Sequence, residues 1–547
     1  MQFSRIHAFL TRYEKFIPLV LLAVFLAVSI PGVSWGAGAL WNPDELVWRV
    51  LEAVRGELIF DETEPDYNYP SLPKYVMFGV AKLVQGLGYG ETQMIIAARA
   101  FSALLGGLAI VMIYLLAKAV SRDTFVAALA GLFAIASSVV SENARFAHND
   151  MYLLLFTVLC VFFLIKYQYT RNRWWLYGSF FAVGLAASSK FTGGSLILIP
   201  LFTVLVLNWH DGRKNLLQTI EMLFICGALA FLGYVIGTPK SLLWMAFYFK
   251  RVIPALQRYP VYGLQPNSVP GIFGQWEVFQ GAVGTFAYVL FLLTFVWAAA
   301  KLVLWRLKRV SLDEKQGQAI LILLSTLILF DLPFMVSVNY IQRYFIPFVP
   351  FFAVLAALFV KDVMDWAARR QIRYAHTVIG LVLVVGIGYS VLRLVSTALL
   401  FMNDARMPAS DYIASIPGKD KVIEYTLYPP RVDKTQFYKA RNYPIYFVKY
   451  PGEIVPEGKF FDYNQGEAGL IEREVDILVV DTLTYARFSD PYICETNPVE
   501  CDFFDKLLAD ETSFKLVKAF EYSLPSWLPQ VTVYAVNPEV RIYEYSP

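Results

Sequence analysis

The stretch "ALWNPDELVWRVLE", residues 39–52, places two adjacent carboxylates, Asp44 and Glu45, shortly after a long apolar segment. A carboxylate close to hydrocarbon loses hydration, so holding it there costs free energy unless it has a partner. Carboxylates also serve as general bases, which take a proton from a reacting hydroxyl group. We therefore interpret Asp44 as the strongest candidate for a catalytic base, with Glu45 as a helper beside it.

Further ionisable residues occur in other loops next to apolar segments. They are Asp66 and Lys74 in "PDYNYPSLPKY", Arg145, His148 and Asp150 in "ENARFAHNDMYL", Lys190 in "SSKFTGG", and Arg343 in "NYIQRYFIPFVP". Carboxylates could form an acid–base or metal-binding centre, while lysine and arginine side chains could hold a phosphate group. If these loops share one face, the set predicts a site for a lipid-linked phosphate that enters from the bilayer.

Ordinary structural roles compete with this interpretation. Lys74 and Lys190 could simply lay their apolar stems along hydrocarbon and extend their charges to the interface. Arg343 could pair with a carboxylate at the surface, and Asp150 could cap the helix that follows it. His148 could have a structural role or face solvent. A common location for these side chains would favour the chemical interpretation.

The apolar segments determine where these loops lie. The chain has 547 residues, of which 57% are hydrophobic and 17% charged, against roughly 25% charged in soluble proteins. A helix needs about 20 apolar residues to cross a bilayer. We therefore predict a polytopic α-helical membrane protein with about 11 transmembrane helices, at residues 16–35, 94–117, 124–142, 150–167, 174–189, 193–208, 217–236, 281–304, 318–338, 343–360 and 377–400.

The distribution of positive charge predicts the orientation of these helices. With a cytoplasmic N-terminus, each cytoplasmic loop carries at least two lysines or arginines, whereas the short loops on the other side carry one each. This agrees with the positive-inside rule. The candidate residues and the C-terminus then lie on the extracytoplasmic side. Residues 16–35 are too long for the apolar part of a signal peptide, so we expect an uncleaved first span. Residues 73–88, interrupted by lysines and glycines, are expected to form an interfacial helix.

Past residue 401 the composition changes. Residues 402–547 contain short β-rich stretches ("KVIEY", "PIYFVKY", "VDILVVD", "VTVYAV") that alternate with helical ones ("ASDYIASI", "FFDKLLAD"). We predict an extracytoplasmic soluble α/β domain here. Residues 1–401 then form a transmembrane domain with long external loops at 36–93 and 237–280.

The cysteines and histidines restrict the remaining choices. Cys494 and Cys501 lie in the external region, where a disulfide between them is plausible in an oxidising compartment. Only His148 of the four histidines is expected outside, which disfavours a multi-histidine metal site. The sequence contains neither a phosphate-binding loop nor H-E-x-x-H, so an ATP-driven pump is poorly supported. A net charge of +3 does not suggest a nucleic-acid partner.

Several motifs occur in an informative order: "NPDE", "YPSLPKY", "ARFAHNDMYLLLF", "SSKFTGG", "QRYFIPFVPFFA" and "NDARMPASDYIASIPGKDKVIEY". In this order they resemble the GT-C superfamily of membrane glycosyltransferases, in the branch of protein O-mannosyltransferases and aminoarabinose lipid A transferases. The resemblance implies the GT-C fold and a cell-membrane enzyme. It also implies a polyprenyl- or dolichyl-phosphate sugar as donor, with transfer to an acceptor on the extracytoplasmic side.

The resemblance also implies roles for individual residues. Asp44 is similar to an aspartate that acts as general base or orients the acceptor, and Asp150 to a second acidic residue. Lys74 and Arg343 are similar to ligands of the donor phosphate in the family, and Lys190 matches such a ligand less closely. The chain departs from the family at "YPSL", where members often have "K-P-P-L" or "H-P-P-L".

Tyr69 stands at that first position, which leaves the donor-phosphate contacts open. The acceptor could be a lipid, a glycan or a protein, although the external domain lacks a β-trefoil pattern, which disfavours protein.

The expected mechanism is a single displacement that inverts the anomeric centre. Asp44 takes the proton of the acceptor hydroxyl as its oxygen attacks the anomeric carbon. Lys74 and Arg343 stabilise the charge that develops on the departing lipid phosphate. This chemistry requires no metal, though Asp44 and Asp150 could hold a divalent cation.

Three other functions remain open. A different GT-C activity, either oligosaccharide transfer or the building of an arabinosyl or mannosyl polymer, would use the same fold. A secondary transporter or lipid flippase would instead place ionisable residues at mid-membrane and contain an internal repeat. A non-catalytic scaffold would bind through its external domain.

Overall fold

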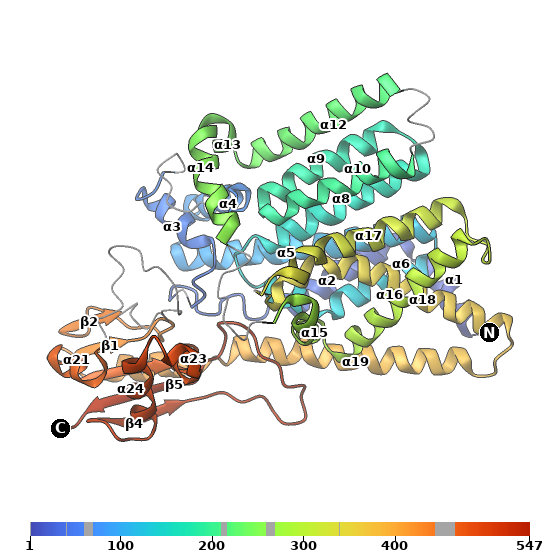
Figure 1. Ribbon diagram of the computed structural model, residues 1–547. Helices are drawn as coiled ribbons and strands as arrows, with labels where there is room; N and C mark the ends of the chain where they lie inside the picture. Colours follow the sequence, from blue (N-terminus) through green and yellow to red (C-terminus); the bar gives the residue numbers. More distant parts are fainter. Residues whose placement is uncertain are drawn as a thin grey trace. The chain divides into compact units, whose positions relative to one another are not determined.

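The computed structural model describes residues 2–39, 41–59, 69–208, 216–258, 269–338, 340–442 and 465–547. The chain divides into two compact units (Figure 1). Ser34–Asp44 and Ser396–Pro547 belong to the second unit, which we call the C-terminal unit. The other described residues form the first, which we call the membrane unit.

The described part of the membrane unit consists of helices and the loops between them. Its elements are α1 (Gln2–Arg12), η1 (Glu14–Phe16), α2 (Ile17–Ser29), α3 (Val47–Arg55), α4 (Leu72–Gly86), α5 (Glu91–Ser121), α6 (Thr124–Ala136), α7 (Ser138–Asn143), α8 (Asp150–Thr170), α9 (Arg173–Ser189), η2 (Phe191–Ile197), α10 (Leu198–Phe202), η3 (Thr203–Leu207), α12 (Leu216–Gly237), α13 (Lys240–Leu243), α14 (Met245–Arg258), α15 (Gly271–Val283), α16 (Thr285–Arg306), α17 (Glu314–Val336), η6 (Gln342–Phe348), α18 (Val349–Arg369) and most of α19 (Ala375–Met402).

Seven helical runs in the described residues are long and apolar enough to cross a membrane. They are Glu91–Ser121, Asp150–Thr170, Leu216–Gly237, Thr285–Arg306, Glu314–Val336, Gln342–Arg369 and Ala375–Ser415. The prediction of a polytopic helical membrane protein is therefore confirmed, and seven of the predicted spans have helices of sufficient length.

The other four predicted spans are helical but shorter or interrupted. Helix α2 has 13 residues and α9 has 17. Extended backbone at Ser137 separates α6 from α7. Residues 191–207 form three short helical pieces in sequence, η2, α10 and η3. Whether these four segments cross the membrane stays a prediction. The expected helix at 73–88 is present as α4.

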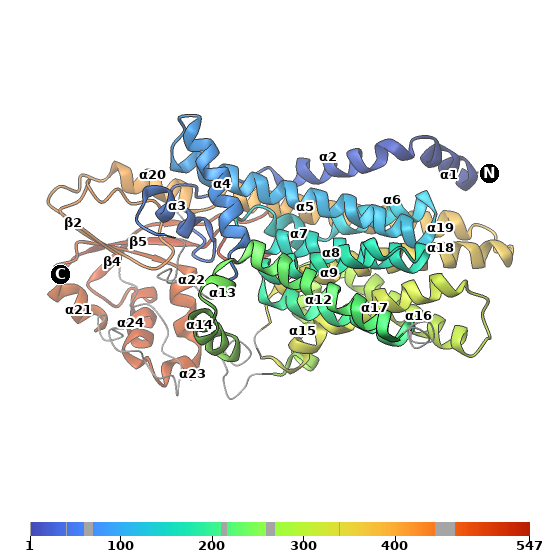
Figure 2. The same ribbon diagram turned by 90° about the horizontal axis from the view of Figure 1, so that it is seen from above.

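Close packing of small residues positions the helices that carry the site. Helices α8, α9 and α12 lie side by side (Figure 2). A Cβ atom on Gly184 of α9 would lie 2.1 Å from the carbonyl oxygen of Ala230 in α12. Only glycine therefore permits this approach of the two backbones, as is common between membrane helices. The packing fixes the end of α9, which is where Lys190 follows.

The C-terminal unit is built around a five-stranded mixed sheet with strand order β2-β1-β3-β5-β4 (Figure 1). Its elements are α20 (Arg406–Ser415), β1 (Val422–Tyr425), β2 (Lys439–Asn442), α21 (Gly466–Glu472), β3 (Ile477–Asp481), α22 (Thr482–Tyr485), η8 (Ala486–Ser489), α23 (Pro491–Cys494), α24 (Pro498–Leu508), β4 (Phe514–Phe520) and β5 (Val540–Tyr545). Strand β1 pairs in parallel with β2 and β3, whereas β5 pairs antiparallel with β3 and β4.

The central strand β3 is buried on both faces, because its alternate side chains join two different cores. Leu478 and Val480 pack with Phe504 of α24, whereas Ile477 and Val479 pack in the core that includes Ile413 of α20. A strand buried on both faces is expected to be apolar throughout, as "ILVV" is. The predicted α/β architecture of this region is thus confirmed.

Three details predicted for the C-terminal region have different outcomes in the structure. The strand predicted at "VTVYAV" (531–536) is wrong: these residues form no strand, and β4 and β5 lie on either side of them. Ala535 and Asn537 have φ of +62° and +55°, which end any extended run there. The stretch "PIYFVKY" lies outside the described residues. The Cys494–Cys501 disulfide is present, which confirms that pairing.

Candidate functional site

Three of the predicted site residues meet at the start of α8. Asp150 Oδ1 accepts a hydrogen bond from Lys190 Nζ at 2.8 Å, and Asp150 Oδ2 lies 3.0 Å from His148 Nδ1. The side chains are 3% (Asp150), 4% (His148) and 12% (Lys190) exposed. Asp150, His148 and Lys190 thus form a polar cluster around a buried carboxylate, which we call the Asp150 cluster.

The ends of two helices explain why these charges lie here. Asp150 is the first residue of α8, and Lys190 directly follows the last residue of α9. A helix dipole favours an acid at the N-terminus and a base at the C-terminus. Asn149 Nδ2 also donates to the carbonyl oxygen of Ser189 at 3.2 Å, which ties the two helix ends together.

Two further predicted residues, Arg343 and Tyr69, lie close to the Asp150 cluster. Burial lowers the pKa of His148, and the positive charges of Arg343 and Lys190 add to this effect, against the opposing influence of Asp150. The Tyr69 ring meets the His148 ring edge to face, with 5.3 Å between their centres. The cluster and the neighbouring Arg343 therefore bring together one carboxylate, two cationic side chains and an imidazole whose lowered pKa favours its neutral form.

The state of His148 has a chemical consequence. Asp150, as a carboxylate, can only accept, so the proton of the neutral imidazole is on Nδ1. The buried Nε2 atom then carries a lone pair, and it has no hydrogen-bond partner among the described residues. An imidazole oriented by a carboxylate in this way can accept a proton from a hydroxyl group.

Lys74 is fully buried in the first turn of α4. The start of this helix is tied to the end of α9 through Thr238. Ser71 N donates to Thr238 Oγ1 at 3.2 Å, and Thr238 Oγ1 lies 2.8 Å from Ser188 Oγ. The helix that carries Lys74 is thus anchored beside the helix that ends before Lys190.

Glu45 takes part in a buried network that was not predicted. Its two oxygens accept from Arg99 Nε at 2.8 Å and Nη2 at 2.6 Å, and Oε1 also accepts from Ala147 N at 2.7 Å. Leu46 N donates back to Ala147 O at 3.0 Å. Glu45 therefore holds the loop that leads into His148. Arg99 could have been found as an arginine inside an apolar segment.

Arg145 is likewise committed to backbone groups. Its guanidinium donates to the carbonyl oxygens of Pro31 at 2.8 Å, Ser141 at 2.7 Å and Val28 at 2.5 Å. These bonds tie the loop after α7 to the last turn of α2 and to Pro31 beyond it. We interpret Arg145 as a residue that shapes this loop.

Asp44 belongs to the C-terminal unit, where it is half-buried. Its backbone N–H donates to Asn42 Oδ1 at 3.0 Å. The pKa of Tyr534 is raised by burial of its hydroxyl group, by Tyr428 and by the carboxylate of Asp44. Arg487 Nη2 donates to the hydroxyl oxygen of Tyr428 at 3.0 Å.

Tyr534 thus lies within electrostatic reach of Asp44, and Tyr428 and Arg487 act on Tyr534 in turn. The sequence offered no signal that singled out Tyr428 or Tyr534 among 33 tyrosines. Asp44 and Asp150 belong to different units, and their convergence on one centre stays a prediction. Asp66 lies outside the described residues. Across the described ranges, no group of three His, Cys, Asp or Glu side chains has the spacing to hold a metal ion.

The fold and the Asp150 cluster define a class of protein, a polytopic membrane protein with buried charges at the ends of its helices. Comparison with known proteins narrows this class. Residues 83–252, which include the Asp150 cluster, match the family model described as dolichyl-phosphate-mannose-protein mannosyltransferase. The similarity to membrane glycosyltransferases that the motifs predicted is thereby confirmed.

Individual relatives agree with this match. Dolichyl-phosphate-mannose–protein mannosyltransferase 1 of Saccharomyces cerevisiae is 26% identical over 270 residues, which cover 45% of this chain and 31% of the relative. The chain thus spans about a third of the length of that relative.

Among solved structures, the archaeal oligosaccharyltransferase AglB from Archaeoglobus fulgidus shares the fold. The TM-score is 0.53 at 14% identity, over 94% of this chain and 75% of that one. ArnT from Cupriavidus metallidurans, bound to undecaprenyl phosphate, gives a TM-score of 0.48 at 14% identity, over 96% and 97% of the two chains.

Proposed function

We propose that the protein is a membrane glycosyltransferase that moves a sugar from a polyprenyl-phosphate donor to an acceptor hydroxyl group. The observation that carries the proposal is the Asp150 cluster, which lies within the segment that matches the mannosyltransferase family. Lys190, whose side chain is 12% exposed, and the nearby Arg343 are suited to hold a phosphate group. The acceptor is a lipid, a glycan or a protein.

Lys190 and Arg343 are the proposed ligands of the donor phosphate, with Lys74 as a further cation on α4. Negative charge develops on the lipid phosphate as the bond to the anomeric carbon breaks. Fixed cations in a site that excludes water stabilise this charge more strongly than water does. The Lys190 ammonium already rests on Asp150, so it is held in place before the donor arrives.

Asp44 is the proposed general base. It removes the proton from the acceptor hydroxyl as that oxygen attacks the anomeric carbon, and the single displacement inverts the sugar. His148 is the second candidate for this role, because its buried Nε2 lone pair has no partner among the described residues. Glu45 is less suited to it, since both of its oxygens are bound to Arg99.

Asp150 has a positioning role in this scheme, since each of its oxygens has a partner. A divalent cation at Asp150 would have to displace either Lys190 or His148. We therefore propose that the cations of the chain, rather than a metal, stabilise the departing phosphate.

We also propose that the N-terminus is cytoplasmic and that the C-terminal unit is extracytoplasmic. The loop charges support this orientation. The Cys494–Cys501 disulfide supports it independently, because disulfides persist in oxidising compartments.

The test uses the purified full-length chain in lipid nanodiscs with a panel of polyprenyl-phosphate sugars, and it measures release of polyprenyl phosphate. We expect Asp44→Asn to abolish release while the melting temperature is unchanged. Asp510→Asn, an exposed position in the same unit, serves as the matched control. Full activity of Asp44→Asn with no activity of His148→Gln would move the role of base to His148. No release from any donor would contradict the proposed function.

Oligosaccharide transfer is the second candidate, because the fold is shared with an archaeal oligosaccharyltransferase. A lipid-linked oligosaccharide in the same panel separates the two. Cleavage of that donor in preference to monosaccharide donors would favour this alternative.

A further inference from the structure

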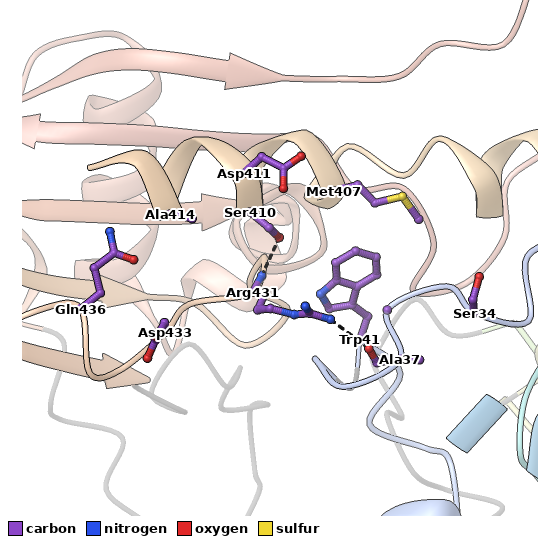
Figure 3. A pocket seen from close by; sticks show the side chains of 11 residues that line it. Ser34, Ala37, Trp41, Met407, Ser410, Asp411, Ala414, Arg431, Asp433 and Gln436 are labelled. Atoms are coloured by element: carbon purple, nitrogen blue, oxygen red, sulfur yellow. Dashed lines mark hydrogen bonds between the residues drawn. The ribbon is translucent and has the colours of Figure 1, made fainter. Parts of the chain in front are cut away.

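The C-terminal unit contains a cavity of about 380 Å³. This lies within the range of roughly 300–1,000 Å³ that is usual for small-molecule sites. Three parts of the unit line it: residues 34–37 with Trp41, helix α20, and the loop between β1 and β2 (Figure 3). All three belong to one unit, and the proposed reaction uses none of the residues that line the cavity.

One of the residues that line the cavity, Trp41, carries a buried hydrogen-bond donor. Trp41 is 4% exposed, and its Nε1 has no hydrogen-bond partner among the described residues. The indole ring is fixed, since the Arg406 guanidinium lies 4.4 Å from its centre. A Cβ atom on Gly36 would lie 2.5 Å from Trp41 Cε3, so the backbone also covers the ring. In Figure 3 the nitrogen edge of the indole is turned towards Arg431.

Two acceptors on another side of the cavity are held in fixed orientations. Asp433 Oδ1 accepts from the backbone N–H of Thr435 at 2.9 Å and from its hydroxyl at 2.7 Å, which leaves Oδ2 for a ligand. Gln436 Nε2 donates to the carbonyl oxygens of Ile413 and Ile416 at 2.8 and 2.6 Å. Its amide oxygen therefore remains as an acceptor.

The charges around the cavity restrict the ligand. Asp411 and Asp433 are acidic, and Arg431 is basic; the latter donates to Ala37 O at 3.0 Å. An anion would meet two carboxylates, and a cation would meet the guanidinium. An apolar molecule would leave the buried Trp41 donor without a partner, which costs free energy. A neutral molecule with several hydroxyl groups can donate to the carboxylates and accept from Trp41 and Arg431.

We propose that this cavity is a carbohydrate-binding site, and that it holds a sugar residue of the acceptor. The side chains of Met407 and Ala414 supply an apolar wall for the carbon face of a sugar ring, and the polar groups fix its hydroxyls. Only the acceptor role rests on the proposed function; sugar binding itself does not. Trp41 lies three residues before Asp44 in the chain, so one segment carries both a sugar ligand and the proposed base.

The test measures binding in the absence of any donor. The full-length protein in nanodiscs is titrated with methyl glycosides of hexoses and pentoses, and saturation-transfer NMR reports contact. Inorganic phosphate and methylammonium serve as the anionic and cationic probes. We expect at least one glycoside to bind, with Trp41→Phe weakening it roughly fivefold through loss of one hydrogen bond. Asp433→Ala should weaken it similarly.

Matched controls are available in the same unit. Trp527, which is 71% exposed, is replaced by phenylalanine, and the exposed Asp510 by alanine; both variants should bind as the wild type does. The proposal is overturned if no glycoside binds, if phosphate or methylammonium binds in place of sugar, or if Trp41→Phe binds sugar unchanged. Sugar binding without transfer from any donor would contradict the proposed function alone, and transfer without sugar binding would contradict the cavity proposal alone.

Discussion

The ion pair between Glu45 and Arg99 provides a sharp test of how the site is built. Both side chains are 0% exposed, and Glu45 also accepts from Ala147 N, one residue before His148. Replacing Glu45 by glutamine keeps the size of the side chain but removes its charge. The Arg99 guanidinium then stays buried without a counter-charge.

The expected loss of stability follows from this burial. Removing one partner of a buried ion pair costs about 3–5 kcal/mol. At roughly 2 °C per kcal/mol for a large unit, the melting temperature should fall by on the order of 6–10 °C. Because the loss comes from an uncompensated charge, the double variant Glu45→Met/Arg99→Met should be more stable than Glu45→Gln alone.

The measurement is thermal unfolding in mild detergent, followed by the fluorescence of a dye that does not react with cysteine. Glu52→Gln is the matched control, since it breaks the half-exposed Arg49–Glu52 pair in α3. Exposed pairs contribute about 0–1 kcal/mol, so this variant should melt close to the wild type. A Glu45→Gln variant that melts as the wild type does but has lost all turnover would refute this reasoning. It would return Glu45 to a catalytic role.

Three further predictions concern the Asp150 cluster and the disulfide. Lys190→Met should weaken the binding of polyprenyl phosphate to the protein in nanodiscs roughly tenfold or more, because a charge-assisted hydrogen bond is lost. Unchanged binding would exclude Lys190 as a phosphate ligand. The pKa of His148 is lower in the folded protein than its ordinary value of 6.5. At a pH above 6.5 the neutral imidazole therefore contributes fully to stability, and this contribution is lost as the pH falls through the pKa of the folded state. Thermal melts should therefore drop with acidification, and less steeply in His148→Gln. Reduction of the disulfide between Cys494 and Cys501, which are 7 positions apart in the sequence, should cost about 2–3 kcal/mol. The variant Cys494→Ser/Cys501→Ser should melt like the reduced wild type.

The helices and the Asp150 cluster could be predicted because their signals are local. A run of about 20 apolar residues indicates a membrane helix wherever it occurs. Asp150 and Lys190 stand at the ends of such runs, so a common face for their loops already suggested that they could meet. The apolar pattern does not show where a helix is interrupted, as the structure shows at Ser137 and within residues 191–207.

The partners of the first loop could not be predicted, because they come from distant parts of the chain. Arg99 is 54 residues from Glu45 in sequence, and Asp404 is 369 residues from Trp35, whose Nε1 donates to it at 2.8 Å. Neither pairing produces a periodic pattern in the sequence from which it could be predicted. The alternation in "VTVYAV" also predicts a strand, but the N–H of Asn537 is bound by Asp404 Oδ2 at 2.6 Å, and the chain turns there.

Residues Ser34–Asp44 belong to the C-terminal unit. That unit can therefore be separated from the rest of the chain only if these residues are kept with it. Trp35 caps the buried Asp404–Arg406 pair, and the Arg406 guanidinium packs on both Trp35 and Trp41. A fragment that begins near Ser396 would expose this pair to solvent. It would fold well only with a peptide of residues 34–44 supplied in trans or joined to it by a linker. Chimeras that exchange C-terminal units between relatives would need to move both pieces together.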